Sequence, residues 1–163
     1  MKSTIYSFLT LFLILACTKK ETPKFQIIGD FNGDKISESL FENKIKNETY
    51  EIKSSNSLIH NFEIPTSTNN LLLLENIGDL NQNGKDEVAI IYNLPDFSNL
   101  NSVHILEYKN EKWTRTLKFS FLELDLYSSD FNINNYIYLN PKNKVCIKKY
   151  IGGEHLDLEI PYP

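Results

Sequence analysis

The chain has 163 residues, of which 41% are hydrophobic and 12% aromatic, and its formal net charge is −4. This length supplies one domain with a buried core and is short for two, and the composition is that of a folded protein. Charges of both signs are mixed along the chain and no basic stripe occurs, so we expect no nucleic-acid partner.

Residues 1–16 have the pattern of a secretory signal peptide. Lys2 precedes an apolar run, residues 5–15, that is too short to cross a bilayer. The run ends in Ile14-Leu15-Ala16-Cys17, which resembles the lipobox of bacterial lipoproteins, with Ile14 where leucine is usual. The resemblance implies cleavage before Cys17 and a lipid on its sulfur. An ordinary signal peptide or an uncleaved anchor with a chance cysteine is the alternative.

The lipobox resemblance also implies a location. Residues 17–24 are polar and read as a tether between the lipid and the domain. Thr18 is not the aspartate that resembles an inner-membrane retention signal, so the outer membrane is favoured.

Residues 25–163 form the predicted domain, and most of their periodicity is two, which indicates strands rather than helices. We expect strands over residues 25–28, 39–45, 49–53, 71–75, 87–92, 103–108, 113–121, 136–139, 145–150 and 155–160. The longer connections are predicted at 54–70 and 94–101, each with a proline.

The strand over 113–121 carries the clearest alternation. One face is predicted to hold Trp113, Arg115, Leu117, Phe119 and Phe121, and the other Thr114, Thr116, Lys118 and Ser120. The polar segment Lys109–Lys112 before it has the length of a hairpin connection, and Gly152-Gly153 signals a second tight turn.

Two segments repeat one spacing of oxygen-bearing side chains. Positions 1, 3, 5 and 9 are Asp30, Asn32, Asp34 and Glu38 in a first loop (residues 30–38), and Asp79, Asn81, Asn83 and Glu87 in a second loop (residues 79–87). Position 7, Ile36 or Lys85, offers only a backbone carbonyl. This is the spacing of an EF-hand-type calcium loop, which needs a sharp turn at position 6.

Position 6 distinguishes the two loops. The second loop has Gly84 there, whereas the first has Lys35. Lys35 must either adopt an unfavourable left-handed conformation or leave the loop less well closed.

The residues that follow the loops narrow the resemblance. EF-hand and dockerin loops are flanked by helices and place an acid at position 12, where this chain has Phe41 and Ile90. A position-9 acid followed by a strand resembles instead the FG-GAP or VCBS repeats of integrin-α-type β-propellers, with the pattern Gly-Asp-x-Asn-Gly-Asp-Gly-x-x-Asp. Residues 29–34 and 78–81 match its opening. The resemblance implies a structural Ca²⁺ in each loop.

Size limits the architecture. The loops begin 49 residues apart, at Asp30 and Asp79, which is about one propeller blade. A closed propeller needs at least four blades, and this chain supplies three at most. We therefore expect an all-β fold, either a partial β-propeller-like or a compact β-sandwich domain with two DxNxD/N calcium-type loops.

Other candidate sites are weaker. His60, His104 and His155 lie in separate segments without zinc-ligand spacing. Glu123 and Asp125 share one face of a strand end and could serve as a glycosidase pair, although solvated acids are commoner there. Cys146 reads as a small buried hydrophobe.

An anchor and two cation loops predict a non-enzymatic, calcium-stabilised envelope lipoprotein that acts as a binding or scaffold module. Its partners are the membrane, through the lipid on Cys17, and a protein or glycan. A lipoprotein inhibitor or immunity factor against a cell-wall-degrading enzyme or toxin is the alternative. A glycan-active enzyme that uses Glu123 and Asp125 is the third possibility.

Overall fold

The computed structural model describes residues 25–45, 49–65, 71–93, 100–122 and 130–162. Within them the protein is all-β, as the period of two predicts: eleven strands form three antiparallel sheets, beside one short 3-10 helix, η1 (Ile133–Asn135). The predicted signal peptide, the tether with Cys17, the pair Glu123 and Asp125, and most of the predicted loop 94–101 lie outside these residues. No helix in the described part of the chain is long and apolar enough to span a membrane.

The first sheet is an antiparallel meander in which each strand lies beside the next. It consists of β1 (Gln26–Gly29), β2 (Glu38–Ile45), β3 (Thr49–Ser54) and β4 (Phe62–Pro65). β4 lies inside the predicted loop 54–70, so that loop prediction is wrong. β4 is short and ends in a proline, which sheets accept at an edge strand, and its buried Ile64 contributes to the core.

The second sheet repeats the meander with β5 (Leu71–Asn76), β6 (Val88–Asn93), β7 (Leu100–Lys109) and β8 (Lys112–Leu122). Its strand β6 is buried on both faces, which explains the continuous apolar run over 88–92. Val88, Ile90 and Tyr92 belong to a core shared with the first sheet, and Ala89 and Ile91 to a second core on the opposite face. The β7–β8 turn at Asn110 and Glu111 (φ 51° and 60°) confirms the predicted hairpin.

A β-bulge in β8 corrects the predicted alternation of that strand. Ile105 pairs with Leu117, but Leu106 pairs with Arg115, so Thr116 is an extra residue. The residues on either side of the bulge consequently face opposite cores, and the prediction that Trp113 to Phe121 share one face is wrong. Trp113 packs beside the rings of Phe31, Phe62 and Tyr108, whereas Phe119 and Phe121 pack in the second core.

The third sheet covers the remaining face of the second. It contains β9 (Ile137–Leu139), β10 (Val145–Ile151) and β11 (Glu154–Glu159), in the order β11-β10-β9. Gly152 and Gly153 form the predicted tight turn with φ of 62° and 99°. Cys146 in β10 is a buried free thiol, which confirms its predicted packing role.

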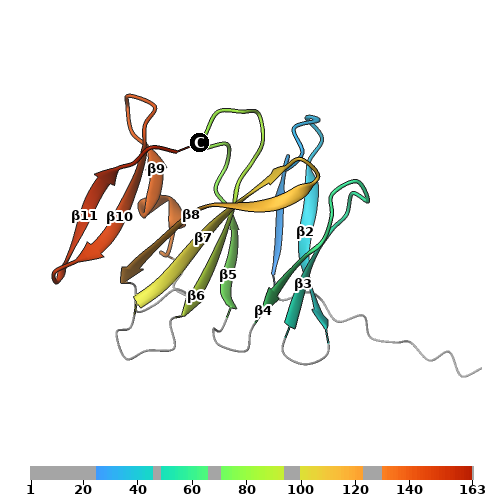
Figure 1. Ribbon diagram of the computed structural model, residues 1–163, viewed down its shortest axis with the longest axis horizontal. Helices are drawn as coiled ribbons and strands as arrows, with labels where there is room; N and C mark the ends of the chain where they lie inside the picture. The colour runs from blue at the N-terminus through green and yellow to red at the C-terminus, as the bar shows by residue number, and fades with distance from the viewer. Residues whose placement is uncertain (1–24, 46–48, 66–70, 94–99, 123–129, 163) are drawn as a thin grey trace, which may run out of the picture.

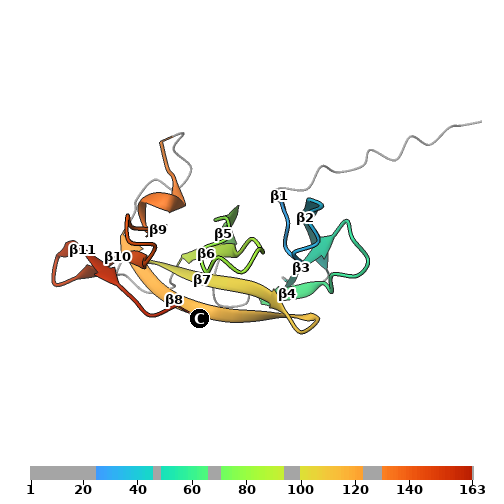
Figure 2. The same ribbon diagram turned by 90° about the horizontal axis from the view of Figure 1, so that it is seen from above.

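The three sheets stand side by side, with the β5–β8 sheet in the middle (Figures 1 and 2). Each of the two hydrophobic cores fills one side of this central sheet. None of the three sheets formed by the described strands closes on itself, and a β-sandwich-like class fits the arrangement. The first loop joins β1 to β2 and the second joins β5 to β6, so the two loops occupy equivalent places in two meanders.

Candidate metal centre

Both loops need two left-handed residues, and each supplies one glycine. In the first loop, position 4 is Gly33 (φ 83°) and position 6 is Lys35 (φ 69°). In the second loop, position 4 is Gln82 (φ 59°) and position 6 is Gly84 (φ 85°). The predicted strain at Lys35 is therefore present, but Gln82 carries its equivalent. Backbone strain does not rank the two loops.

Position 1 organises each loop through hydrogen bonds from backbone N–H groups. The Asp30 carboxylate accepts from Gly33 N at 2.7 Å and from Lys35 N at 2.8 Å. The Asp79 carboxylate accepts from Asn83 N at 2.9 Å and from Gly84 N at 2.7 Å.

Positions 3 and 5 use their side-chain oxygens in the same way. Asn32 Oδ1 accepts from Asp34 N, and Asn81 Oδ1 accepts from Asn83 N, at 2.9 and 3.1 Å. At position 5, Asp34 Oδ1 accepts from Ile36 N and Asn83 Oδ1 from Lys85 N, at 2.8 and 3.0 Å. Backbone N–H groups of each loop thus hold the oxygens at positions 1, 3 and 5 in place.

Position 9 is buried in both loops and is tied to position 2. Glu38 is 2% exposed and accepts from Phe31 N at 3.1 Å, and Glu87 is 0% exposed and accepts from Leu80 N at 2.6 Å. Phe31 and Leu80 are themselves core residues, so the core fixes each loop from within.

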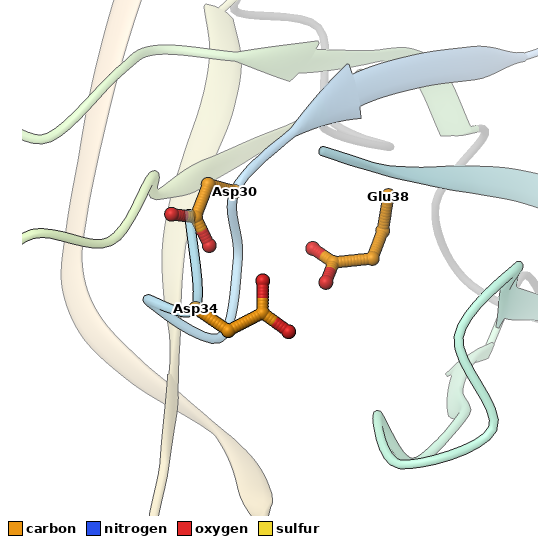
Figure 3. Close-up of side chains that lie close together, drawn as sticks. All are labelled: Asp30, Asp34 and Glu38. Carbon is orange, nitrogen blue, oxygen red and sulfur yellow. The ribbon is translucent and has the colours of Figure 1, made fainter. Parts of the chain in front are cut away.

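The first loop brings three carboxylates together. One oxygen from each of Asp30, Asp34 and Glu38 lies within 4.8 Å of the others, and their side chains converge in Figure 3. This cluster could hold a metal ion. Glu38 already has a donor on each oxygen, because Asn56 Nδ2 donates to its Oε1 at 3.1 Å.

The second loop differs at position 9. Within the described residues, Glu87 Oε1 is buried without a hydrogen-bond partner. Burial raises the pKa of Glu87 to about 8; the Leu80 N–H lowers it, and the charges of Asp79, Glu107 and Asp86 raise it further. A buried carboxylate oxygen without a donor is costly unless something else compensates its charge.

Glu107 also belongs to this site. Because it lies outside the loop, the loop spacing in the sequence does not identify it. It lies on β7, is 3% exposed, and accepts from Asn83 Nδ2 at 2.7 Å. Tyr162 approaches from the carboxy-terminal tail, with its hydroxyl 2.8 Å from Thr116 Oγ1. Burial raises the pKa of Tyr162, and the charges of Glu87 and Glu107 add to the rise.

The two loops contact each other through Asp86. Its Oδ2 accepts from Asp30 N at 3.1 Å and from Asn76 Nδ2 at 2.9 Å, and its own N–H donates to Asp30 O at 2.8 Å. A Cβ added at Gly29 would lie 2.4 Å from Asn76 Nδ2 and 2.5 Å from Asp86 Oδ2, which explains the glycine. This contact has no signal in the sequence, because the two loops are far apart along the chain.

The two position-7 residues make different contacts through their side chains. The Ile36 side chain is 67% exposed. The Lys85 side chain passes close to Gly33 of the first loop, and its Nζ donates to Tyr108 O at 3.2 Å.

The three histidines do not assemble. His60 contacts the Glu111 carbonyl, His104 packs beside Tyr92, and His155 Nε2 accepts from Leu122 N. Among the described residues, Asp30, Asp34 and Glu38 form the only group of three acidic, histidine or cysteine side chains whose ligand atoms all lie within 4.8 Å of one another.

Comparison of the chain with known protein families, with curated proteins and with solved structures finds no match.

Proposed function

We propose that this chain is a calcium-stabilised envelope lipoprotein that acts as a binding or scaffold module without catalysis. The main support for a bound cation comes from the second loop, where the buried Glu87 Oε1 has no hydrogen-bond donor among the described residues. Asp79 and Glu107 lie close enough to raise the pKa of this carboxyl further, so the site concentrates negative charge. A divalent cation would compensate this charge.

The donors available in the second loop suit calcium. Asp79, Asn81, Asn83 and Glu87 would hold the ion through oxygen, with the Lys85 carbonyl completing the set. Carboxylate, amide and carbonyl oxygens are the ligands that Ca²⁺ prefers, and zinc would favour sulfur or nitrogen. In the first loop the matching set is Asp30, Asn32, Asp34, the Ile36 carbonyl and Glu38.

We also propose that the domain is a partial propeller of the integrin-α type. Support comes from two four-stranded meanders that stand side by side, each with its loop between the first and second strands. A bound cation in each loop would then tie β1 to β2 and β5 to β6. The role of calcium is structural, and the partner, a protein or a glycan, binds elsewhere on the surface.

Isothermal titration of the purified full chain with calcium tests this function. We expect saturable binding, because the loop oxygens are ordered in advance, and weaker binding of magnesium, which demands a stricter octahedral geometry. The same protein should turn over no glycan, peptide or phosphoester substrate, with calcium or with chelator. Absence of calcium binding would contradict the structural role, and calcium-dependent turnover would favour an enzyme.

A separate prediction concerns the lipid anchor on Cys17. Cys17→Ala should abolish labelling by a lipid precursor and cause the uncleaved form to accumulate, because the cysteine is both the lipid acceptor and the cleavage position of a lipobox. Cys146→Ala is the matched control and should leave labelling unchanged, since Cys146 is buried in β10. Mass spectrometry of a mature form that begins elsewhere than Cys17 would contradict the lipoprotein proposal.

A further inference from the structure

Position 5 is where the two loops differ most in charge. The first loop has a carboxylate there, Asp34, and the second has the neutral amide of Asn83. Glu107 of β7 lies against this amide, with its Oε1 2.7 Å from Asn83 Nδ2. Within the described part of the chain, no acid from another strand makes the equivalent contact with Asp34, whose other oxygen accepts from Asn32 Nδ2 at 2.9 Å.

The hydrogen bond to Glu107 sets which atom of the Asn83 amide faces the loop. A carboxylate offers oxygen on both sides, whereas an amide offers one oxygen and one nitrogen, and only the oxygen can bind a cation. Because Glu107 accepts from Nδ2, Asn83 Oδ1 turns to the loop, where it accepts from Lys85 N at 3.0 Å. Asp34 Oδ1 has the equivalent place, since it accepts from Ile36 N at 2.8 Å.

Glu107 also restores the missing charge. The first loop holds three acids, Asp30, Asp34 and Glu38, and the second holds Asp79 and Glu87. Glu107 is only 3% exposed, and neither it nor Glu87 has an ion-pair partner within the described residues. Buried, unpaired acids are costly, and two that lie beside one candidate site point to a cation that offsets both.

We propose that Glu107 is a positioning residue of the second loop's cation site: it holds the Asn83 oxygen toward the ion and supplies the charge that Asp34 supplies in the first loop. The inference rests on the proposed function and names a further residue of the same site. Asn83 and Glu107 together replace one aspartate.

A charge-exchange series in the full chain tests this role. Glu107→Gln keeps an oxygen that accepts from Asn83 Nδ2 but removes the charge. We expect the loss of this charge to weaken calcium binding at the second loop about 10- to 100-fold, the usual range when a hydrogen-bond partner of a metal ligand is changed. The double variant Asn83→Asp with Glu107→Gln moves the charge into the loop and lets the new amide donate to the new carboxylate. It should bind calcium within about threefold of the parent chain, a difference under 1 kcal/mol.

Heteronuclear NMR resolves the two sites in this series. The N–H groups of Phe31 and Leu80 donate to the position-9 acids of the first and second loops, so their shifts during a calcium titration report each loop separately. Glu107→Gln should move the Leu80 titration and leave the Phe31 titration in place. Glu63→Gln, an exposed acid on β4, removes the same charge and should move neither.

The outcomes separate the two levels of the proposal. A residue that only fills the sheet would tolerate Glu107→Gln, because the hydrogen bond persists. An unchanged Leu80 titration in Glu107→Gln, in a chain that binds calcium, would therefore overturn the role of Glu107 alone. A double variant as weak as Glu107→Gln would overturn the charge exchange and with it the proposal. A parent chain that binds no calcium would overturn this role and the proposed function together.

Discussion

Glu87→Gln is expected to remove more of the calcium-dependent stability than Glu38→Gln. Glu38 has a donor on each oxygen, whereas Glu87 has one donor and one buried oxygen without a partner among the described residues. A bound cation would therefore supply the missing partner of Glu87, but only an additional partner of Glu38. The first loop has more acids of its own, which would favour it on charge alone; Glu107 offsets this difference.

The size of the effect follows from mass action. One site filled at calcium a hundredfold above its dissociation constant stabilises the fold by about 2.7 kcal/mol. If Glu87→Gln weakens that site a hundredfold, the same calcium concentration leaves a gain of about 0.4 kcal/mol. Urea unfolding in calcium and in chelator measures both gains.

The chelator arm provides the internal control. Without calcium, Glu87→Gln should be close to neutral, because the glutamine still accepts from Leu80 N and the raised pKa of Glu87, about 8, already keeps that carboxyl largely protonated at neutral pH. Glu38→Gln should lose about 1 kcal/mol without calcium, because only one of its two donors keeps an oxygen. Equal losses of calcium-dependent stability in the two variants, or a larger loss for Glu38→Gln, would contradict this ranking.

Most strands could be predicted from the sequence because their signals are local. The alternation of apolar and polar residues in β11, and the turn residues between β10 and β11, lie within a few positions of each other. β4 was missed because a short strand ending in proline gains its place from pairing with β3. The bulge at Thr116 was missed for a related reason: it is defined by which β7 residue lies opposite, and β8 alone does not contain that information.

The candidate site also contains residues with local sequence signals and residues that only folding brings together. The spacing of oxygens over 30–38 and 79–87 predicts a ligand set for each loop, because the ligands of a calcium loop are continuous in sequence. Glu107 and Asn56 reach the loops from β7 and from the connection between β3 and β4, so only the folded chain brings them there. The same holds for Asp86, whose contact with Asp30 joins segments 56 residues apart.

The FG-GAP pattern that the two loops resemble has three glycines, and two of them fall at positions 4 and 6, the two left-handed positions of each loop. This chain keeps one glycine per loop, Gly33 in the first and Gly84 in the second, and places Lys35 and Gln82 at the other two positions. A residue with a Cβ destabilises the fold by about 1–2 kcal/mol when it is left-handed. Glycine avoids this strain, but its greater loss of backbone entropy on folding offsets about 0.5–1 kcal/mol of the gain. Both side chains are exposed, so their removal sacrifices no core packing.

Lys35→Gly and Gln82→Gly should therefore each stabilise the fold by about 0.5–1 kcal/mol. Each kcal/mol gained should raise the melting temperature by roughly 2–4 °C. Chelator should be present in these measurements, so that cation affinity does not enter. Lys35→Ala and Gln82→Ala remove the same side chains but keep the Cβ, and we expect no gain from them.

Gly84→Ala is the reverse test: an added Cβ meets no atom within 4 Å, so a loss of about 1 kcal/mol would come from its φ of 85° alone. Glycine variants less stable than the alanine variants would show that the loops of the folded protein do not hold positions 4 and 6 left-handed.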